Sequence, residues 1–164
     1  MARKEKEYAW QILCGKRRVP PKEWRFHPAA NTAIICSMAT TFTPVVYGIS
    51  QCDTVKKARN WLQENGVAYT WHDFKKQGLA PEVLQQWLHT LGREALLNRK
   101  GTTWRRLDAA AQACALADDA GAAALMLVLH SVIKRPLVDW GNGQLTLGFD
   151  PQQWRQLLAA HASQ

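Results

Sequence analysis

A strand–helix–strand pattern over residues 45–72 constrains the fold of this chain more than any other feature. Val45 to Ile49 is a short, β-branched, apolar run that is typical of a buried strand. Residues 53–65 place apolar side chains along one face of a helix, and Gly66 supplies a C-terminal stop. Residues 67–72 predict a second strand. Because two strands joined through a helix pair in parallel, we expect an α/β fold that begins with a βαβ unit.

Cys52 lies at the junction between the first strand and the helix. The unpaired N–H groups and the positive end of the dipole at a helix N-terminus favour an anion at such a position. This environment lowers the pKa of a thiol and makes it a nucleophile. A half-buried structural cysteine is the alternative, since cysteine is among the residue types most often buried. The local pattern leaves both interpretations open.

The later elements are predicted from capping residues and apolar patterning. They are helices starting at Pro81, near Glu94 and after Asp108, a buried helix over 120–129, two strands of a hairpin at 137–140 and 144–149, and a terminal helix over 151–162. The order is therefore βαβ, helices, ββα.

The bulk composition is that of one ordinary globular domain. The chain has 164 residues, 47% of them hydrophobic and 21% charged. No apolar stretch approaches the roughly 18 residues that a membrane-spanning helix needs. The four cysteines form neither a CxxC pair nor a zinc spacing, and no secretory signal is evident, so we expect reduced thiols in the cytoplasm. No pattern indicates a metal, nucleotide or flavin, and we expect no membrane partner.

The positive charge is concentrated at the start of the chain. The net charge is +8, and residues 1–37 hold eight basic against three acidic residues, whereas residues 38–164 hold thirteen against ten. Since the main part lacks a strong basic excess, we expect no nucleic-acid partner. We expect residues 1–37 to be an extension, disordered or read from a start codon placed too far upstream; a genuine basic tail is the alternative. Residues 38–164 would form the folded domain, with a helical insertion at about 78–130.

Three motifs in order carry a resemblance to a known family. They are residues 47–58 (YGISQCDTVKKA), 95–105 (ALLNRKGTTWR) and 133–138 (IKRPLV). From about Val45 to Leu158 the chain resembles the arsenate reductase/Spx family, ArsC for short, and most closely its small YffB-type members. The resemblance implies a thioredoxin-like fold with an inserted helical subdomain.

The resemblance also implies an active site. The nucleophile matches Cys52, and Arg135, just before a proline expected to follow a cis peptide bond, would face the thiol. An arginine there can stabilise a thiolate or hold an oxyanion or carboxylate through a fork of donors. Arsenate reductases carry a further arginine for the oxyanion at a position that either Asn98 or Arg99 can match.

Four residues are expected to line the substrate site around Cys52 and Arg135: Arg99, Pro136, Thr54 and Lys56. The first-turn N–H groups around Thr54 and Val55 favour the thiolate, and Lys56 is expected to assist. Asp53 opposes these groups locally.

Departures from the family pattern limit the reactions that we expect of this chain. The arginine that arsenate reductases place on the strand after Arg135 matches Leu147, and a histidine four residues before their cysteine matches Gly48. The positions three before and three after Cys52 are Ile49 and Val55, which excludes the CxxC disulfide of Spx-type regulators. We expect Cys114 to be a packing residue rather than a resolving thiol.

These residues predict a glutathione-dependent thiol–disulfide reductase, a thiol oxidoreductase with one nucleophilic cysteine. Glutathione, a co-substrate rather than a bound cofactor, would resolve the mixed disulfide in place of a second cysteine. The alternative is an Spx-like non-catalytic regulator that binds RNA polymerase or another protein. A true arsenate reductase, with glutaredoxin as a possible partner, ranks third.

Overall fold

The computed structural model describes residues 43–141 and 143–162, with the side chain of residue 162 left out. The predicted extension over residues 1–37 lies outside the described residues.

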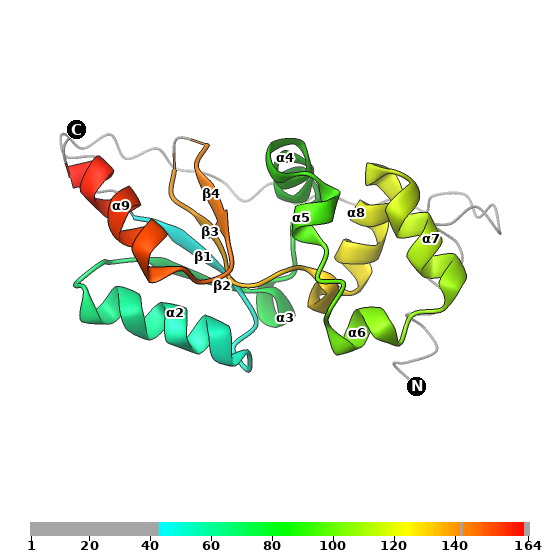
Figure 1. Ribbon diagram of the computed structural model, residues 1–164, viewed down its shortest axis with the longest axis horizontal. Helices are drawn as coiled ribbons and strands as arrows, with labels where there is room; N and C mark the ends of the chain where they lie inside the picture. Colours follow the sequence, from blue (N-terminus) through cyan, green and yellow to red (C-terminus); the bar gives the residue numbers. More distant parts are fainter. Residues whose placement is uncertain (1–42, 142, 163–164) are drawn as a thin grey trace.

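A mixed four-stranded sheet forms the centre of the described chain, in the order β2-β1-β3-β4 (Figure 1). The strands are β1 (Val45–Gly48), β2 (Thr70–Asp73), β3 (Leu137–Asp139) and β4 (Leu145–Leu147). β1 pairs in parallel with β2 and antiparallel with β3, which in turn pairs antiparallel with β4. The parallel register places Gly48 opposite Asp73, so the two strands end side by side.

Helices α2 (Asp53–Glu64) and α9 (Pro151–Ala162) pack against the same face of the sheet. A cluster of buried residues joins them to β1 and β3, and it consists of Val46, Ala58, Trp61, Leu62, Val138, Trp140 and Trp154. In α2 the buried positions follow the helical repeat predicted from the sequence. Trp61 and Trp154 meet edge to face, with ring centroids 5.7 Å apart.

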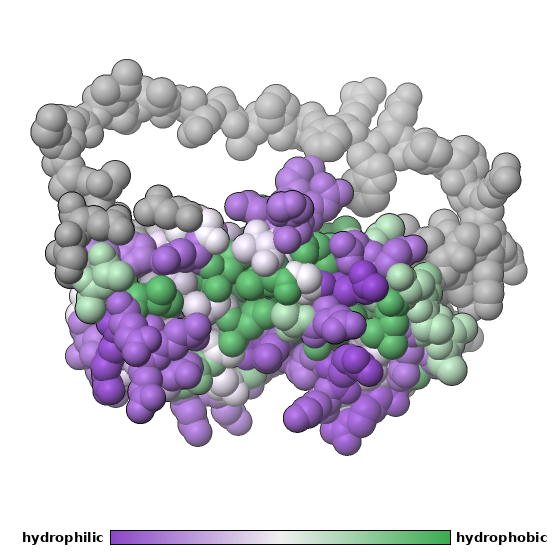
Figure 2. Space-filling model, turned by 45° about the horizontal axis from the view of Figure 1, so that its top comes forward, coloured by the Kyte–Doolittle hydropathy of each residue, from purple (hydrophilic) through white to green (hydrophobic). Residues whose placement is uncertain are grey.

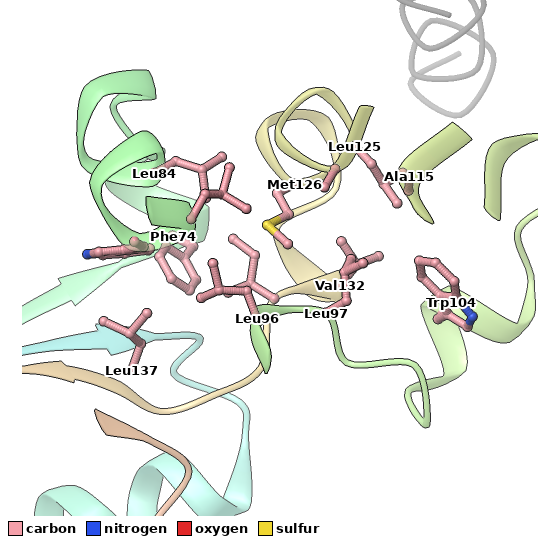
Figure 3. Packing of buried hydrophobic residues seen from close by; sticks show 14 of the residues in the cluster. Phe74, Leu84, Leu96, Leu97, Trp104, Ala115, Leu125, Met126, Val132 and Leu137 are labelled. Atoms are coloured by element: carbon pink, nitrogen blue, oxygen red, sulfur yellow. The ribbon is translucent and has the colours of Figure 1, made fainter. Parts of the chain in front are cut away.

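The helical insertion lies between β2 and β3. It comprises α3 (Phe74–Gln77), α4 (Pro81–Leu91), α5 (Arg93–Leu96), α6 (Thr102–Arg105), α7 (Ala109–Ala117), α8 (Asp119–Val128) and the 3-10 turn η1 (His130–Val132). The side chains of Asp108 and Asp118 cap α7 and α8 by accepting from backbone N–H groups. An apolar core continues from the sheet into this insertion, as the packing around Phe74, Leu96 and Met126 shows (Figure 3).

Apolar residues also gather in the middle of the face seen in Figure 2, between two polar regions. Leu145 and Leu147 of β4 and Val83 of α4 are partly buried and pack against the apolar core that contains Phe74, Leu96 and Met126. The insertion is thus packed onto the second face of the sheet.

The expected thioredoxin-like α/β fold is confirmed, with strand boundaries corrected. The first strand ends at Gly48 rather than Ile49, the third at Asp139 rather than Trp140, and the last spans Leu145–Leu147 rather than 144–149. The second strand begins at Thr70, not at Val67, because the N–H of Val67 donates to the Leu62 carbonyl at 2.9 Å. That bond belongs to the end of α2, where Gly66 adopts a φ of +67°. Val67 therefore belongs to the segment that links α2 to β2 and not to the strand itself.

Candidate active site

Cys52 forms the N-terminal boundary of α2. Its N–H donates to the Ile49 carbonyl at 3.0 Å, which closes a tight turn after β1, and its carbonyl accepts from the N–H of Lys56 at 3.0 Å. The Cys52 backbone is extended, with φ −84° and ψ 123°, as is usual at this position. The residue is partly exposed. The thiol thus lies at the positive end of a helix and is open to a substrate.

The pKa of the Cys52 thiol is lowered from its ordinary value. Burial raises this pKa, but the Val55 N–H, the Arg135 side chain, the Thr54 N–H and the charge of Arg135 together lower it by more. Cys52 makes no side-chain capping hydrogen bond of ordinary geometry. The N–H groups therefore act on the sulfur as close dipoles, and they favour its anionic form.

Arg135 is held beside the thiol by the loop that precedes β3. Its Nη1 donates to the Ser131 carbonyl at 2.8 Å and to the Ile133 carbonyl at 3.0 Å. Within the described residues its Nε is buried without a hydrogen-bond partner. The peptide bond from Arg135 to Pro136 is cis, and Pro136 is buried. A cation anchored in this way keeps its charge near the sulfur with little freedom to move away.

Two of the expected substrate-site residues, Lys56 and Arg99, are not among the described groups that lower the pKa of the thiol. Lys56 is exposed and pairs at 3.4 Å with Asp53 on its own helix, a surface ion pair of small energetic weight. Arg99 is exposed in the loop after α5. The N–H of Thr54, by contrast, helps to lower the pKa of the Cys52 thiol, although the Thr54 side chain is exposed.

The loop after α5 is attached to the Arg135 loop through backbone hydrogen bonds. The Asn98 N–H donates to the Val132 carbonyl at 2.7 Å, and the Lys134 N–H donates to the Leu96 carbonyl at 2.7 Å. Leu97 and Ile133 form an isolated antiparallel bridge between them. Of the two alternatives for the oxyanion position, Asn98 is thus the one bonded to the Arg135 loop.

Asp73 is a site residue that the sequence reasoning missed. It is 2% exposed, and its carboxylate accepts from the Lys75 N–H at 2.9 Å. Burial raises the pKa of Asp73, but the Lys75 N–H, the nearby hydroxyl and N–H of Ser50, two residues before Cys52, and the charge of Lys76 lower it by more. A carboxylate at the end of a predicted strand, where it can cap the start of a following helix, was the signal in the sequence that could have indicated this residue.

Three other features bear on function: possible metal-binding groups, possible membrane-spanning helices and the second cysteine of the described residues. Among the residues that the structure describes, no group of three or more His, Cys, Asp and Glu side chains could hold a metal ion. None of the helices in residues 43–141 and 143–162 combines the length and apolar character of a transmembrane span. Cys114, in α7, is only partly buried.

Comparison with known proteins gives consistent matches. The ArsC family matches residues 47–157. An uncharacterized protein of Haemophilus influenzae is 34% identical over 114 residues, which are 70% of this chain and 97% of that protein.

Two solved structures are similar as well. The YffB protein shares 46% identity at a TM-score of 0.67, over 71% of this chain and 99% of its own. An arsenate reductase (ArsC) related protein from Brucella melitensis shares 43% identity at a TM-score of 0.59, over 73% of this chain and 97% of its own.

Proposed function

Because the chain belongs to the ArsC family and is of the YffB type, we propose that it is a thiol–disulfide reductase with Cys52 as its nucleophile and glutathione as its co-substrate. The family is thiol-reductase-like, and the observation that carries the proposal is the lowered pKa of a partly exposed Cys52 thiol beside the anchored Arg135. The thiolate, not the thiol, attacks disulfides, so a lowered pKa increases the reactive fraction near neutral pH.

The first step transfers a glutathionyl group. The Cys52 thiolate attacks the glutathione sulfur of a mixed disulfide R–S–S–G, and a bond forms between Sγ and that sulfur as the S–S bond of the mixed disulfide breaks. The R thiolate leaves with the electron pair and takes up a proton from water. Arg135 and the N–H groups of Thr54 and Val55 stabilise Cys52 before the attack and stabilise it again when it leaves in the second step.

The second step returns the enzyme to its starting state. The thiolate of a second glutathione attacks the glutathionyl sulfur on Cys52, and the Cys52 thiolate leaves. One disulfide, R–S–S–G, has been reduced and one, oxidised glutathione, has been formed, so electrons balance without another oxidant.

Support for glutathione comes from the cysteines and charges of the described residues. Cys114, the other cysteine among the described residues, lies in α7, in the part of the insertion farthest from the sheet (Figure 1). An external thiol is therefore favoured for the second step. Glutathione carries two carboxylates, and the exposed cation Lys75 near the site suits one of them.

Two positions favour a thiol substrate over arsenate. Gly48 has no room for a larger side chain, because a Cβ atom there would lie 2.9 Å from Val55 Cγ2. Leu147 is partly buried against the apolar core and supplies no charge. An arsenate dianion would therefore find fewer cations than the family pattern provides.

The test is an assay of glutathione-dependent reduction of a low-molecular-weight glutathione mixed disulfide, with arsenate as a parallel substrate. We expect turnover of the disulfide, its loss in Cys52→Ser, and a clear reduction in Arg135→Ala. Lys134→Ala is the matched control, because Lys134 is the exposed neighbour of Arg135. Turnover that survives Cys52→Ser, or that occurs only with arsenate, would refute the proposal.

A further inference from the structure

Asp73 and the turn before Cys52 lie at the same end of the sheet. Asp73 is the last residue of β2, and its partner in the parallel register is Gly48, the last residue of β1. The chain after β1 makes the turn through Ser50 and Gln51 to Cys52, and the chain after β2 enters α3. The strand pairing therefore brings the carboxylate of Asp73, which follows Cys52 by 21 residues in the sequence, against the turn that carries the thiol.

The Asp73 carboxylate lies between the two segments. It accepts from the Lys75 N–H at 2.9 Å, and the N–H and hydroxyl of Ser50 lie close enough to it to lower its pKa. The N–H of Asp73 itself donates to Gln77 Oε1 at 2.9 Å. At 2% exposure, water cannot replace these partners. A carboxylate has about four acceptor sites, so three donors suit it, whereas a carboxamide would turn an N–H₂ group toward one of them.

A second contact joins the same two segments. Lys75 Nζ donates to Gln51 Oε1 at 2.8 Å. Both of these side chains are exposed, so this bond contributes less than the buried one. The start of α3 nevertheless holds both residues of the turn, Ser50 through Asp73 and Gln51 through Lys75.

We propose that Asp73 is a positioning residue for Cys52: it holds the Ser50–Gln51 turn against the start of α3 and so sets the place of the thiol at the N-terminus of α2. The inference deepens the proposed function and rests on it for the role of the thiol. Cys52 must lie close to the N–H groups of Thr54 and Val55 to gain from them, and the interaction of a charge with a helix terminus falls off within one turn.

The charges around the thiol decide the sign of the expected effect. The charged groups on the elements around it are Arg135 and Lys134 of the loop before β3, Asp73, Lys75 and Lys76 at the start of α3, and Asp53, Lys56, Lys57, Arg59 and Glu64 on its own helix. If Asp73 acted as a nearby negative charge, its neutralisation would lower the pKa of Cys52. If it acts by holding the turn, its loss moves the thiol away from its donors and raises that pKa.

The experiment measures the pH profile of Cys52 alkylation by iodoacetamide in the full chain, with Cys52 identified by mass spectrometry of its peptide. The variants are Asp73→Asn and Ser50→Ala, and the control is Asp108→Asn, the same substitution at a similar cap of α7. We expect the midpoint to move to higher pH in Asp73→Asn and by less in Ser50→Ala, with slower alkylation at pH 6. Asp108→Asn should leave the profile in place, because asparagine also caps a helix.

A profile of Asp73→Asn that is unchanged, or moved to lower pH, would overturn the inference. If Asp73→Asn does not fold, Ser50→Ala decides by the same criterion. The proposed function has a separate readout in the same data, because it requires the wild-type midpoint to lie below the value of about 8.5 for free cysteine. The inference depends only on the difference between variants and wild type.

Discussion

The backbone of Gly48 lies directly against the side chain of Val55, so closely that a Cβ atom at position 48 would come within 2.9 Å of Val55 Cγ2. The ring of Trp71 closes the same space from β2, at 3.2 Å from that Cβ position. This contact joins the end of β1 to the first turn of α2. The short turn that carries Cys52 depends on it, because the turn spans these two elements.

Gly48→Ala is expected to destabilise the protein by about 1–3 kcal/mol, the usual cost of overpacking a tight contact. Chemical denaturation would measure the change. Val55→Ala in the same chain should relieve part of the clash, so the double variant should lose less than the sum of the two single losses. Additive losses would show that Gly48 and Val55 are not in close contact.

Replacement of Arg135 is expected to affect both the thiol and the loop that holds the arginine. In Arg135→Ala the pKa of Cys52 should rise, because a cation and a hydrogen-bond donor are lost. The unfolding free energy should fall by about 1.5–3 kcal/mol as the bonds to the Ser131 and Ile133 carbonyls disappear. Thiol titration and urea unfolding would measure the two effects.

Arg135→Lys should give an intermediate thiol pKa, since lysine keeps the charge and loses the planar fork. Lys134→Ala should change stability by less than about 0.5 kcal/mol, as is usual for an exposed residue. A thiol pKa in Arg135→Ala equal to that of the wild type would contradict the assigned role of the arginine.

Stability is expected to depend on pH through Cys52. The pKa of this thiol is lower in the folded state than in the unfolded state, so the folded protein binds fewer protons in the interval between the two values. The stabilisation is therefore complete above the unfolded value of about 8.5 and is lost as pH falls through the folded value. Unfolding free energies of wild type and Cys52→Ser, compared across this range, should diverge as pH rises and then differ by a constant.

Thr146→Val tests a buried hydrogen bond between β4 and the residue after β3. Trp140 Nε1 donates to Thr146 Oγ1 at 2.8 Å, and these residues are 0% and 6% exposed. Valine matches the shape but leaves the indole N–H without this acceptor, at an expected cost of about 1–3 kcal/mol. Thr146→Ser keeps the hydroxyl and should retain the bond. A lower unfolding temperature for Thr146→Ser than for Thr146→Val would therefore contradict a stabilising role of this hydrogen bond.

Local patterns in the sequence predicted most of the elements because they depend on neighbouring residues. The terminal helix begins at Pro151 and ends at Ala162 as predicted, and Asp108 caps its helix. The fold class followed from the order of such elements together with the family resemblance. The start of β2 was missed, because the bond from Val67 to Leu62 depends on how α2 ends.

The site divides in the same way. The sequence by itself determined that Cys52 stands between a strand and a helix, since the residues on both sides specify those elements. It left open whether Asn98 or Arg99 matches the oxyanion arginine of the family; of the two, it is the Asn98 N–H that donates to the Arg135 loop, at the Val132 carbonyl.

No local pattern decided which distant groups surround the thiol. That Arg135 faces Cys52 was expected only from the family resemblance, and the tertiary structure brought Asp73 to the turn at Ser50, because β1 and β2 pair in one particular register. Register depends on which faces of several strands become buried together, and no single segment carries that information. The nucleophile could therefore be read from its neighbours, whereas the groups that hold it in place required the folded chain.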